Sequence, residues 1–254
     1  EHLYYFGGYD CWVGVNSPQA MILTSGGDEP TLVVRNVDIS LARETTFLAD
    51  IRTYHLVNDD FAGIVRSVLA EKGVNSGRVG IELQCYAVTY ALGKALADQL
   101  APLAIVDSTM LLGDLRILKE PAEIALIERA GRHAEQGLLA LRSHARQGVS
   151  EIAVSAAIEA AVRGSGSDYW SIPVELASGY RSAGGHATAR EKLIEAGDLL
   201  HVEFAGVAAR YHATALQTLA VGEPSKRARD LYRIGLESLD AGLSAIKVGT
   251  PVGD

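Results

Sequence analysis

Hydrophobic and polar residues follow one another along the first half of the chain in a way that predicts alternating strands and helices. Apolar residues recur at helical spacing over residues 59–72 and 87–100. Short β-rich runs, bounded by Gly, Asp or Pro, predict strands at residues 2–6, 20–24, 31–35, 78–83 and 103–107. This alternation indicates an α/β layer structure.

The pattern changes after a polar stretch near residues 113–121, which we interpret as the boundary between domains 1–115 and 116–254. Pro121 suits the first position of a helix, with acidic residues beside it at the positive end of the helix dipole. Ser150 is a good N-cap for a second helix, which is expected to stop at 164–167.

Short strands are predicted between residues 172 and 221, followed by a third helix from about Pro224 to Lys247. The last two strands are separated by so few residues that an antiparallel hairpin is expected. The second domain is therefore of the α+β class.

Composition and charge narrow the functional classes. The chain has 254 residues, of which 48% are hydrophobic and 21% charged, as in globular proteins. Its net charge of −8 is a poor match for nucleic acid. The two cysteines, Cys11 and Cys85, form neither a disulfide framework nor a zinc cluster, which favours a reducing, cytoplasmic compartment. No run approaches the roughly 20 apolar residues of a membrane helix, and both ends of the chain are interpreted as those of a fragment.

Acidic and basic residues lie within the predicted hairpin. Glu203 interrupts an otherwise apolar strand, and His201 shares its face because side chains alternate along a strand. On the following strand Arg210, His212 and Thr214 share a face. A carboxylate inside a sheet is costly unless it is paired. The spacing alone leaves two interpretations open, a structural ion pair of Glu203 with Arg210 and a functional site.

The hairpin and the preceding loop of small residues, which ends at His186, resemble the creatinase / aminopeptidase P / prolidase superfamily with its pita-bread fold. The stretches LYYFGGYD and ILKEPAEIALIERAG resemble the same superfamily. The matching positions are Ala177, Ser178, Gly179, Ser182, Ala183, His186, Gly197, Asp198, Glu203, Tyr211, Thr218 and Gly222. The resemblance implies an α/β N-terminal domain, an incomplete α+β pita-bread domain and a homodimer.

The chain departs from the metallopeptidase members of that superfamily at a metal position. Those members bind two divalent metals with Asp, Asp, His, Glu and Glu ligands. The first two positions fall on Glu203 and Thr214 in this sequence, and Gln217 replaces a usual arginine. A neutral hydroxyl is a poor substitute for a bridging carboxylate between two hard cations, so a two-metal site is disfavoured.

These residues favour a creatinase-like or ectoine-hydrolase-like enzyme that cleaves a C–N bond in a small amidinium or guanidinium zwitterion, without a cofactor. In this hypothesis Glu203 binds the cation and His186 transfers the proton. Trp12 would stack on the cation, although packing is its commoner role. The substrate carboxylate would bind an arginine. The substrate-binding residues expected are Arg181, Arg210, Trp12 and His212.

Two alternatives remain. One is a Xaa-Pro dipeptidase or aminopeptidase with a single divalent metal, Mn, Zn or Co, at Glu203. The other is a degenerate, non-catalytic member of the superfamily. We expect the isolated chain to show no hydrolase activity, because the resemblance implies that further strands close the site.

Overall fold

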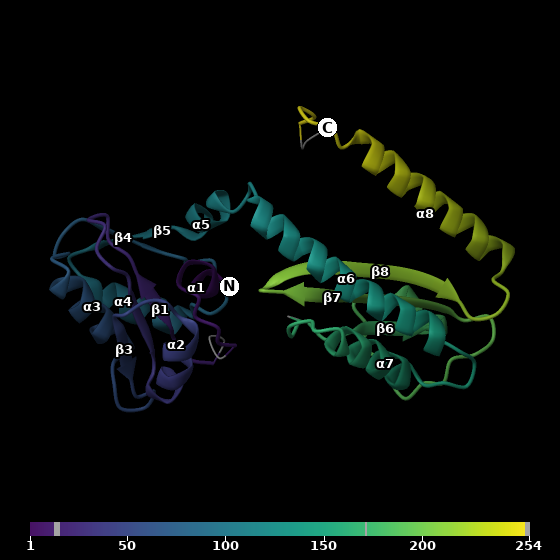
Figure 1. The fold of residues 1–254 in the computed structure, drawn as a ribbon, viewed down its shortest axis with the longest axis horizontal. Coiled ribbons are helices and arrows are strands. Elements are labelled where there is room, and N and C mark those ends of the chain that lie inside the picture. Colours follow the sequence, from purple (N-terminus) through teal and green to yellow (C-terminus); the bar gives the residue numbers. More distant parts are fainter. Residues whose placement is uncertain (13–15, 171, 252–254) are drawn as a thin grey trace. The chain divides into compact units, whose positions relative to one another are not determined.

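The computed structural model describes residues 1–12, 16–170 and 172–251. The chain divides into two compact units, Glu1–Leu118 and Lys119–Asp254 (Figure 1). Each unit mixes helices with sheet, so the predicted classes, α/β followed by α+β, are confirmed.

The first unit contains two small sheets. In the three-stranded sheet, β2 (Thr31–Arg35) pairs antiparallel with β1 (Ala20–Ile22) and parallel with β3 (Ile51–Tyr54). The other sheet pairs β4 (Arg78–Ile81) with β5 (Ala104–Asp107) in parallel. The four strands predicted within this region, at 20–24, 31–35, 78–83 and 103–107, are confirmed, while β3 was not predicted.

Helices supply the rest of the first unit. Those predicted over 59–72 and 87–100 are confirmed as α3 (Phe61–Glu71) and α4 (Tyr90–Leu100), and both bury their apolar stripes in a core that includes strand residues of both sheets. The side chains of Asp60 and Thr89 cap them. Two short helices, α2 (Ile39–Thr45) and α5 (Thr109–Leu115), were not predicted.

The strand predicted at residues 2–6 is wrong, because this segment forms helix α1 (His2–Gly7). Gly8 ends the helix in the left-handed conformation, at φ 71°, and its N–H donates to the carbonyl of Tyr4. Such a C-cap is typical of glycine. The aromatic residues suggested a strand by their propensity, but the glycine that follows them is the stronger local signal.

The second unit packs two helices on an antiparallel sheet of order β6-β7-β8. Its strands are β6 (Glu175–Ser178), β7 (Leu199–Ala208) and β8 (Tyr211–Ala220). Helices α6 (Pro121–His144) and α7 (Glu151–Gly164) begin where predicted, with Pro121 in the first turn and Ser150 Oγ accepting from Ala153 N at 3.2 Å. Their shared core with the sheet includes Leu141, Ile158, Leu200, Val202 and Phe204.

The predicted hairpin is confirmed, and a two-residue turn joins β7 to β8. Ala209 and Arg210 both have positive φ, 48° and 67°, as a tight hairpin turn requires. The register pairs Ala208 with Tyr211 and Glu203 with Leu216. Every polar side chain of the hairpin is placed by this register.

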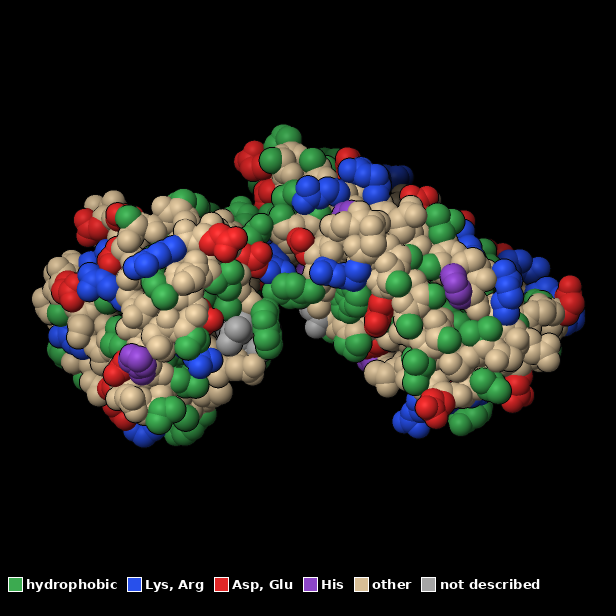
Figure 2. Space-filling view, turned by 60° about the horizontal axis from the view of Figure 1, so that its bottom comes forward, with side chains coloured by type: hydrophobic (Ala, Val, Ile, Leu, Met, Phe, Trp, Pro, Cys, Tyr) green, Lys and Arg blue, Asp and Glu red, His purple; other side chains and the backbone are tan. Residues whose placement is uncertain are grey.

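The predicted third helix is α8 (Lys226–Ala245), which the Ser225 side chain caps. No described residue of α8 is buried, and Leu231, Leu239 and Leu243 are exposed. Among the described residues, none of the helices has both the length and the apolar character that a bilayer crossing demands. Basic and acidic side chains are interspersed on the face of the first unit at the left of Figure 2.

Candidate functional site

The sheet of the second unit places two glutamates side by side. Strands β6 and β7 pair antiparallel, and Glu175 lies directly opposite Glu203 in their register. Paired residues point to the same face of a sheet. Because Leu200, Val202 and Phe204 occupy the core face of β7, the two carboxylates lie on the other face, where both side chains are partly buried.

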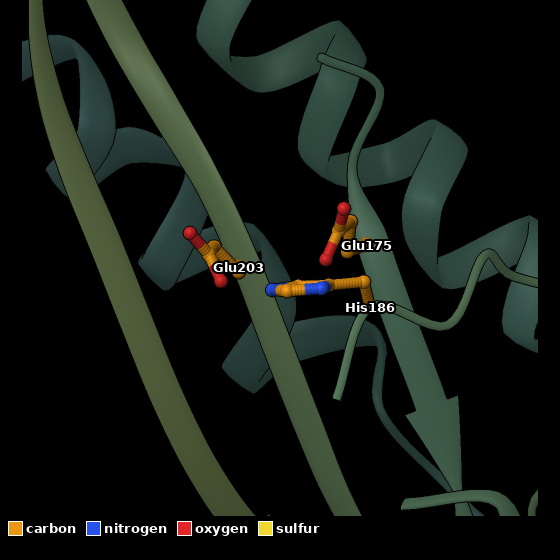
Figure 3. Close-up of side chains that lie close together, drawn as sticks. All are labelled: Glu175, His186 and Glu203. Carbon is orange, nitrogen blue, oxygen red and sulfur yellow. The ribbon is translucent and has the colours of Figure 1, made fainter. Parts of the chain in front are cut away.

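His186 joins the two glutamates from the loop that follows β6. The loop begins with a 3-10 helix over Gly179–Ala183 and returns so that Thr188 bridges to Glu175. One nitrogen of His186 and one carboxylate oxygen of each glutamate all lie within 4.8 Å of one another. Figure 3 shows the imidazole close to both carboxylates. The predicted catalytic residues His186 and Glu203 therefore lie together, and Glu175 is a third member that the sequence did not single out.

One atom of this cluster has an unmet hydrogen-bonding capacity. Oε2 of Glu175 is buried and accepts no hydrogen bond from the described residues. A buried acceptor without a partner carries a desolvation cost. Two carboxylates placed opposite each other also repel. The cluster is therefore suited to a positively charged ligand, either an organic cation with hydrogen-bond donors or a metal ion with free coordination positions.

A buried glutamate organises the loop that carries His186. Glu151, at the start of α7, is fully buried and accepts hydrogen bonds from Ser178 N and Ser178 Oγ, both at 2.8 Å, and from Arg190 N at 3.0 Å. Its second oxygen also accepts from Nη1 of Arg181. Local sequence patterns contain no sign of this role, because an acidic residue in a first helical turn is ordinarily explained by the helix dipole.

The structure corrects the role expected of Arg181. We predicted that its guanidinium binds a substrate carboxylate, but this group is paired with Glu151 and also donates to the carbonyl of Thr188 at 2.7 Å. Only 11% of its side chain is exposed. A buried carboxylate needs a nearby cation, and Arg181 supplies it. We therefore assign Arg181 to the support of the loop.

The ion pair considered between Glu203 and Arg210 is also wrong. Arg210 lies in the hairpin turn, beyond Ala208, which is five residues along β7 from Glu203. That separation is roughly 17 Å at about 3.4 Å per residue, which is longer than an arginine side chain. The guanidinium of Arg210 lies 3.9 Å from the centre of the Tyr169 ring, a cation–π contact.

The other predicted substrate-binding residues lie away from the cluster or in the other unit. His212 is opposite Val207 near the turn, and its Nδ1 is 3.0 Å from the carbonyl oxygen of Arg210. Trp12 belongs to the first unit, where 64% of it is exposed. Neither residue is brought beside Glu203 within the second unit.

The residue at the position of the second aspartate ligand of the metallopeptidase pattern does not contribute a carboxylate. Thr214 lies opposite Ala205, on the same face as Glu203, and its side chain is exposed. These two positions of the hairpin offer one carboxylate, whereas a bridged pair of metals needs more negative oxygens to offset the repulsion between the ions. They do not fit a two-metal centre.

Comparisons with known proteins agree in both units. Residues 1–118 match the creatinase/prolidase N-terminal domain, and residues 125–254 match metallopeptidase family M24. The chain is 27% identical to a Xaa-Pro dipeptidase of Pyrococcus furiosus, over 88% of this chain and 60% of that protein. It is 28% identical to a creatinase of Bacillus sp. (strain B-0618), over 94% of this chain and 58% of that protein.

Solved structures give the same fold. The prolidase of Pyrococcus horikoshii OT3 superposes with a TM-score of 0.81 at 24% identity, over 96% of this chain and 65% of that one. A Xaa-Pro dipeptidase of Bacillus anthracis gives a TM-score of 0.78 at 26% identity, over 93% and 63%. This chain thus spans less than two thirds of the length of these proteins.

Proposed function

Because this chain belongs to metallopeptidase family M24, we propose that the complete protein hydrolyses a C–N bond in a small molecule whose reacting end is a planar, positively charged amidinium or guanidinium group. The observation that carries this proposal is the charge of the hairpin. Glu203 offers a partly buried carboxylate, while a neutral threonine stands at the position of the second aspartate. A site that holds fewer bridging carboxylates is better matched to one organic cation than to two metal ions.

The chain's own residues can bind such a group and move the proton. Glu203 would accept charge-assisted hydrogen bonds from the cationic N–H groups. A nitrogen of His186 lies within 4.8 Å of a carboxylate oxygen of Glu203, so it would lie beside the bound carbon. In the hydrolysis His186 takes a proton from water as the oxygen adds to that carbon. The C–N bond then breaks, and the imidazolium returns the proton to the leaving nitrogen.

An imidazole can serve as both base and acid, which suits both of these proton transfers. The carboxylate of the substrate zwitterion needs a different partner from Arg181, whose guanidinium is held by Glu151. The stacking of Trp12 on the cation stays a prediction, as do the homodimer and the cytoplasmic location.

A dipeptidase with a single divalent metal is the second candidate. Its support is that Glu175, His186 and Glu203 present three donor groups within 4.8 Å of one another, and that dipeptidases occur among the relatives. Carboxylate and imidazole donors suit Mn, Zn or Co. The ion would supply Lewis acidity at the scissile bond, and these three residues would hold it.

Assays of the full-length protein separate the candidates. We expect turnover of a zwitterionic amidinium or guanidinium compound, with creatine and ectoine as the first substrates, and we expect the rate to survive chelation. His186→Ala should abolish the activity, whereas His55→Ala, an exposed histidine of the first unit, should not change it. Release of proline from dipeptides that requires an added divalent ion, together with no turnover of the cationic substrates, would refute the proposal in favour of the dipeptidase.

A further inference from the structure

Glu175 lies at the site, and no part of the proposed reaction uses it. It is the first residue of β6 and stands directly across the ladder from Glu203. Figure 3 shows its carboxylate, like that of Glu203, close to the His186 ring. The buried Oε2 of Glu175 has no hydrogen-bond partner among the described residues. A paired-carboxylate arrangement therefore exists before any guest arrives.

Two basic side chains close to His186 in the chain are engaged elsewhere. Arg181 is paired with Glu151, and Nζ of Lys192 lies 2.8 Å from Oδ2 of Asp198. These two cations, with side-chain exposures of 11% and 18%, are held on partners of their own. Among the described residues no lysine or arginine is ion-paired with Glu175 or Glu203, and one nitrogen of His186 lies within 4.8 Å of a carboxylate oxygen of each. The repulsion between the two carboxylates is thus left for an external cation to relieve.

The hydrogen bonding of His186 distinguishes between a metal ion and an organic cation. A histidine that ligates a metal almost always donates its other N–H to a carboxylate or carbonyl, which fixes the ring. Among the described residues His186 has no such hydrogen bond, and its side chain is exposed on a loop that contains Gly184 and Gly185. An amidinium or guanidinium needs no fixed imidazole, because its own planar set of N–H groups can donate to both carboxylates.

We propose that Glu175 is a specificity-determining residue, which together with Glu203 binds the positively charged nitrogen group of the substrate. This inference rests on the proposed function for the identity of the substrate, but it concerns binding and not the chemical step. Glu203 accepts from one edge of the planar cation and Glu175 from another. The two glutamates select a cation over its neutral analogue, because a neutral ligand leaves the negative charges of two adjacent carboxylates uncompensated.

The test measures binding to the full-length protein by calorimetry, with acetamidinium and methylguanidinium as probes and acetamide as the neutral control. The variants are Glu175→Gln, Glu203→Gln and the matched control Glu191→Gln, an exposed glutamate of the neighbouring loop. We expect both cations to bind the parent and acetamide not to bind. Glu175→Gln should weaken cation binding by roughly tenfold or more, as the loss of a charge-assisted hydrogen bond does, while Glu191→Gln should bind like the parent.

Three results would overturn the inference. They are the absence of cation binding to the parent, binding that Glu175→Gln leaves unchanged, and tight uptake of one Mn²⁺ that Glu175→Gln abolishes, which would make the cluster a metal site. Circular dichroism of each variant checks that the fold is intact. Because binding is measured without turnover, a protein that binds the probes through Glu175 but hydrolyses no cationic substrate refutes only the proposed function.

Discussion

Glu151 offers a sharp test of how the site is supported. Its buried carboxylate receives four donor groups, which come from Ser178 at one end of the His186 loop and from Arg181 and Arg190 further along it. Glu151→Gln keeps the size of the side chain and removes its charge. The loop then loses one of the two acceptor oxygens, and Arg181 is left without a counterion in a site where only 11% of its side chain is exposed.

The magnitude follows from the burial of both partners. Removing one member of a buried ion pair costs about 3–5 kcal/mol, and Glu151 is fully buried. We expect the lower end, about 3 kcal/mol, because Arg181 keeps its hydrogen bond to the carbonyl of Thr188 at 2.7 Å. Arg181→Met should be similarly costly, since it leaves the carboxylate without a cation. In the double variant neither charge remains, so the loss should be about 2 kcal/mol smaller than the sum of the two single losses.

Urea unfolding measures these free energies. Trp170 packs against the core of the second unit and reports on that unit when Trp12, which is 64% exposed, is replaced by Phe. Glu159→Gln, later in α7, is the matched control and should change stability by no more than about 0.5 kcal/mol. If the single losses add to within about 0.5 kcal/mol in the double variant, then Glu151 and Arg181 are not coupled and the reasoning fails.

Three further predictions concern packing, pH and the last helix. Within α6, a Cβ on Gly137 would lie 2.3 Å from Cε2 of Phe204, whereas one on Gly131 meets nothing within 4 Å. Gly137→Ala should therefore destabilise the protein by about 1–3 kcal/mol, whereas Gly131→Ala should stabilise it by about 0.5–1 kcal/mol. Equal urea midpoints for these two variants would contradict the packing described for α6. Burial raises the pKa of Asp198, but hydrogen bonds from Lys192 and a backbone N–H outweigh burial and hold that pKa below its usual value. The stability that Asp198 contributes is then present above its unfolded pKa of about 3.9 and is lost as the pH falls through the lower folded value. Asp198→Asn should therefore lower the free energy of unfolding at pH 7 but leave it equal to that of the parent in acid. A difference between the two proteins that stays constant across pH would refute this. Removing α8, none of whose described residues is buried, should leave the melting temperature of the second unit unchanged, and a lower value would show that the helix supports it.

Local chemistry made most of the second unit predictable. Pro121 and Ser150 mark helix starts through their own backbone and side chain, and the hairpin follows from the short gap between two strand patterns. Local chemistry also explains the error at the chain start, because the aromatic residues there favour a strand, whereas Gly8 caps helix α1. Short elements such as β3 depend on pairing with a distant neighbour, which local patterns do not contain.

The site was predictable only in part, because its members meet through long-range pairing. Glu203 was found because it interrupts an apolar strand. Glu175 interrupts the apolar run at 172–178 in the same way, so a signal for it existed. What the sequence lacked was the β6–β7 register that puts the two opposite each other. Arg181 was assigned to substrate because its partner, Glu151, lies 30 residues earlier in the chain.

The position of the Glu175 carboxylate supports the proposed function more strongly than its presence alone. In the order β6-β7-β8, Glu203 on the central strand lies opposite Glu175 of β6 and Leu216 of β8, whereas Thr214 of β8 lies opposite Ala205, two residues further along β7. The metallopeptidase pattern would put its second acid on β8, whereas this chain puts an acid on β6, beside the loop of His186. The negative charge therefore faces the residue that we propose for proton transfer. A planar cation held between Glu175 and Glu203 would present its central carbon to that imidazole, which is the arrangement that hydrolysis at an amidinium or guanidinium carbon requires.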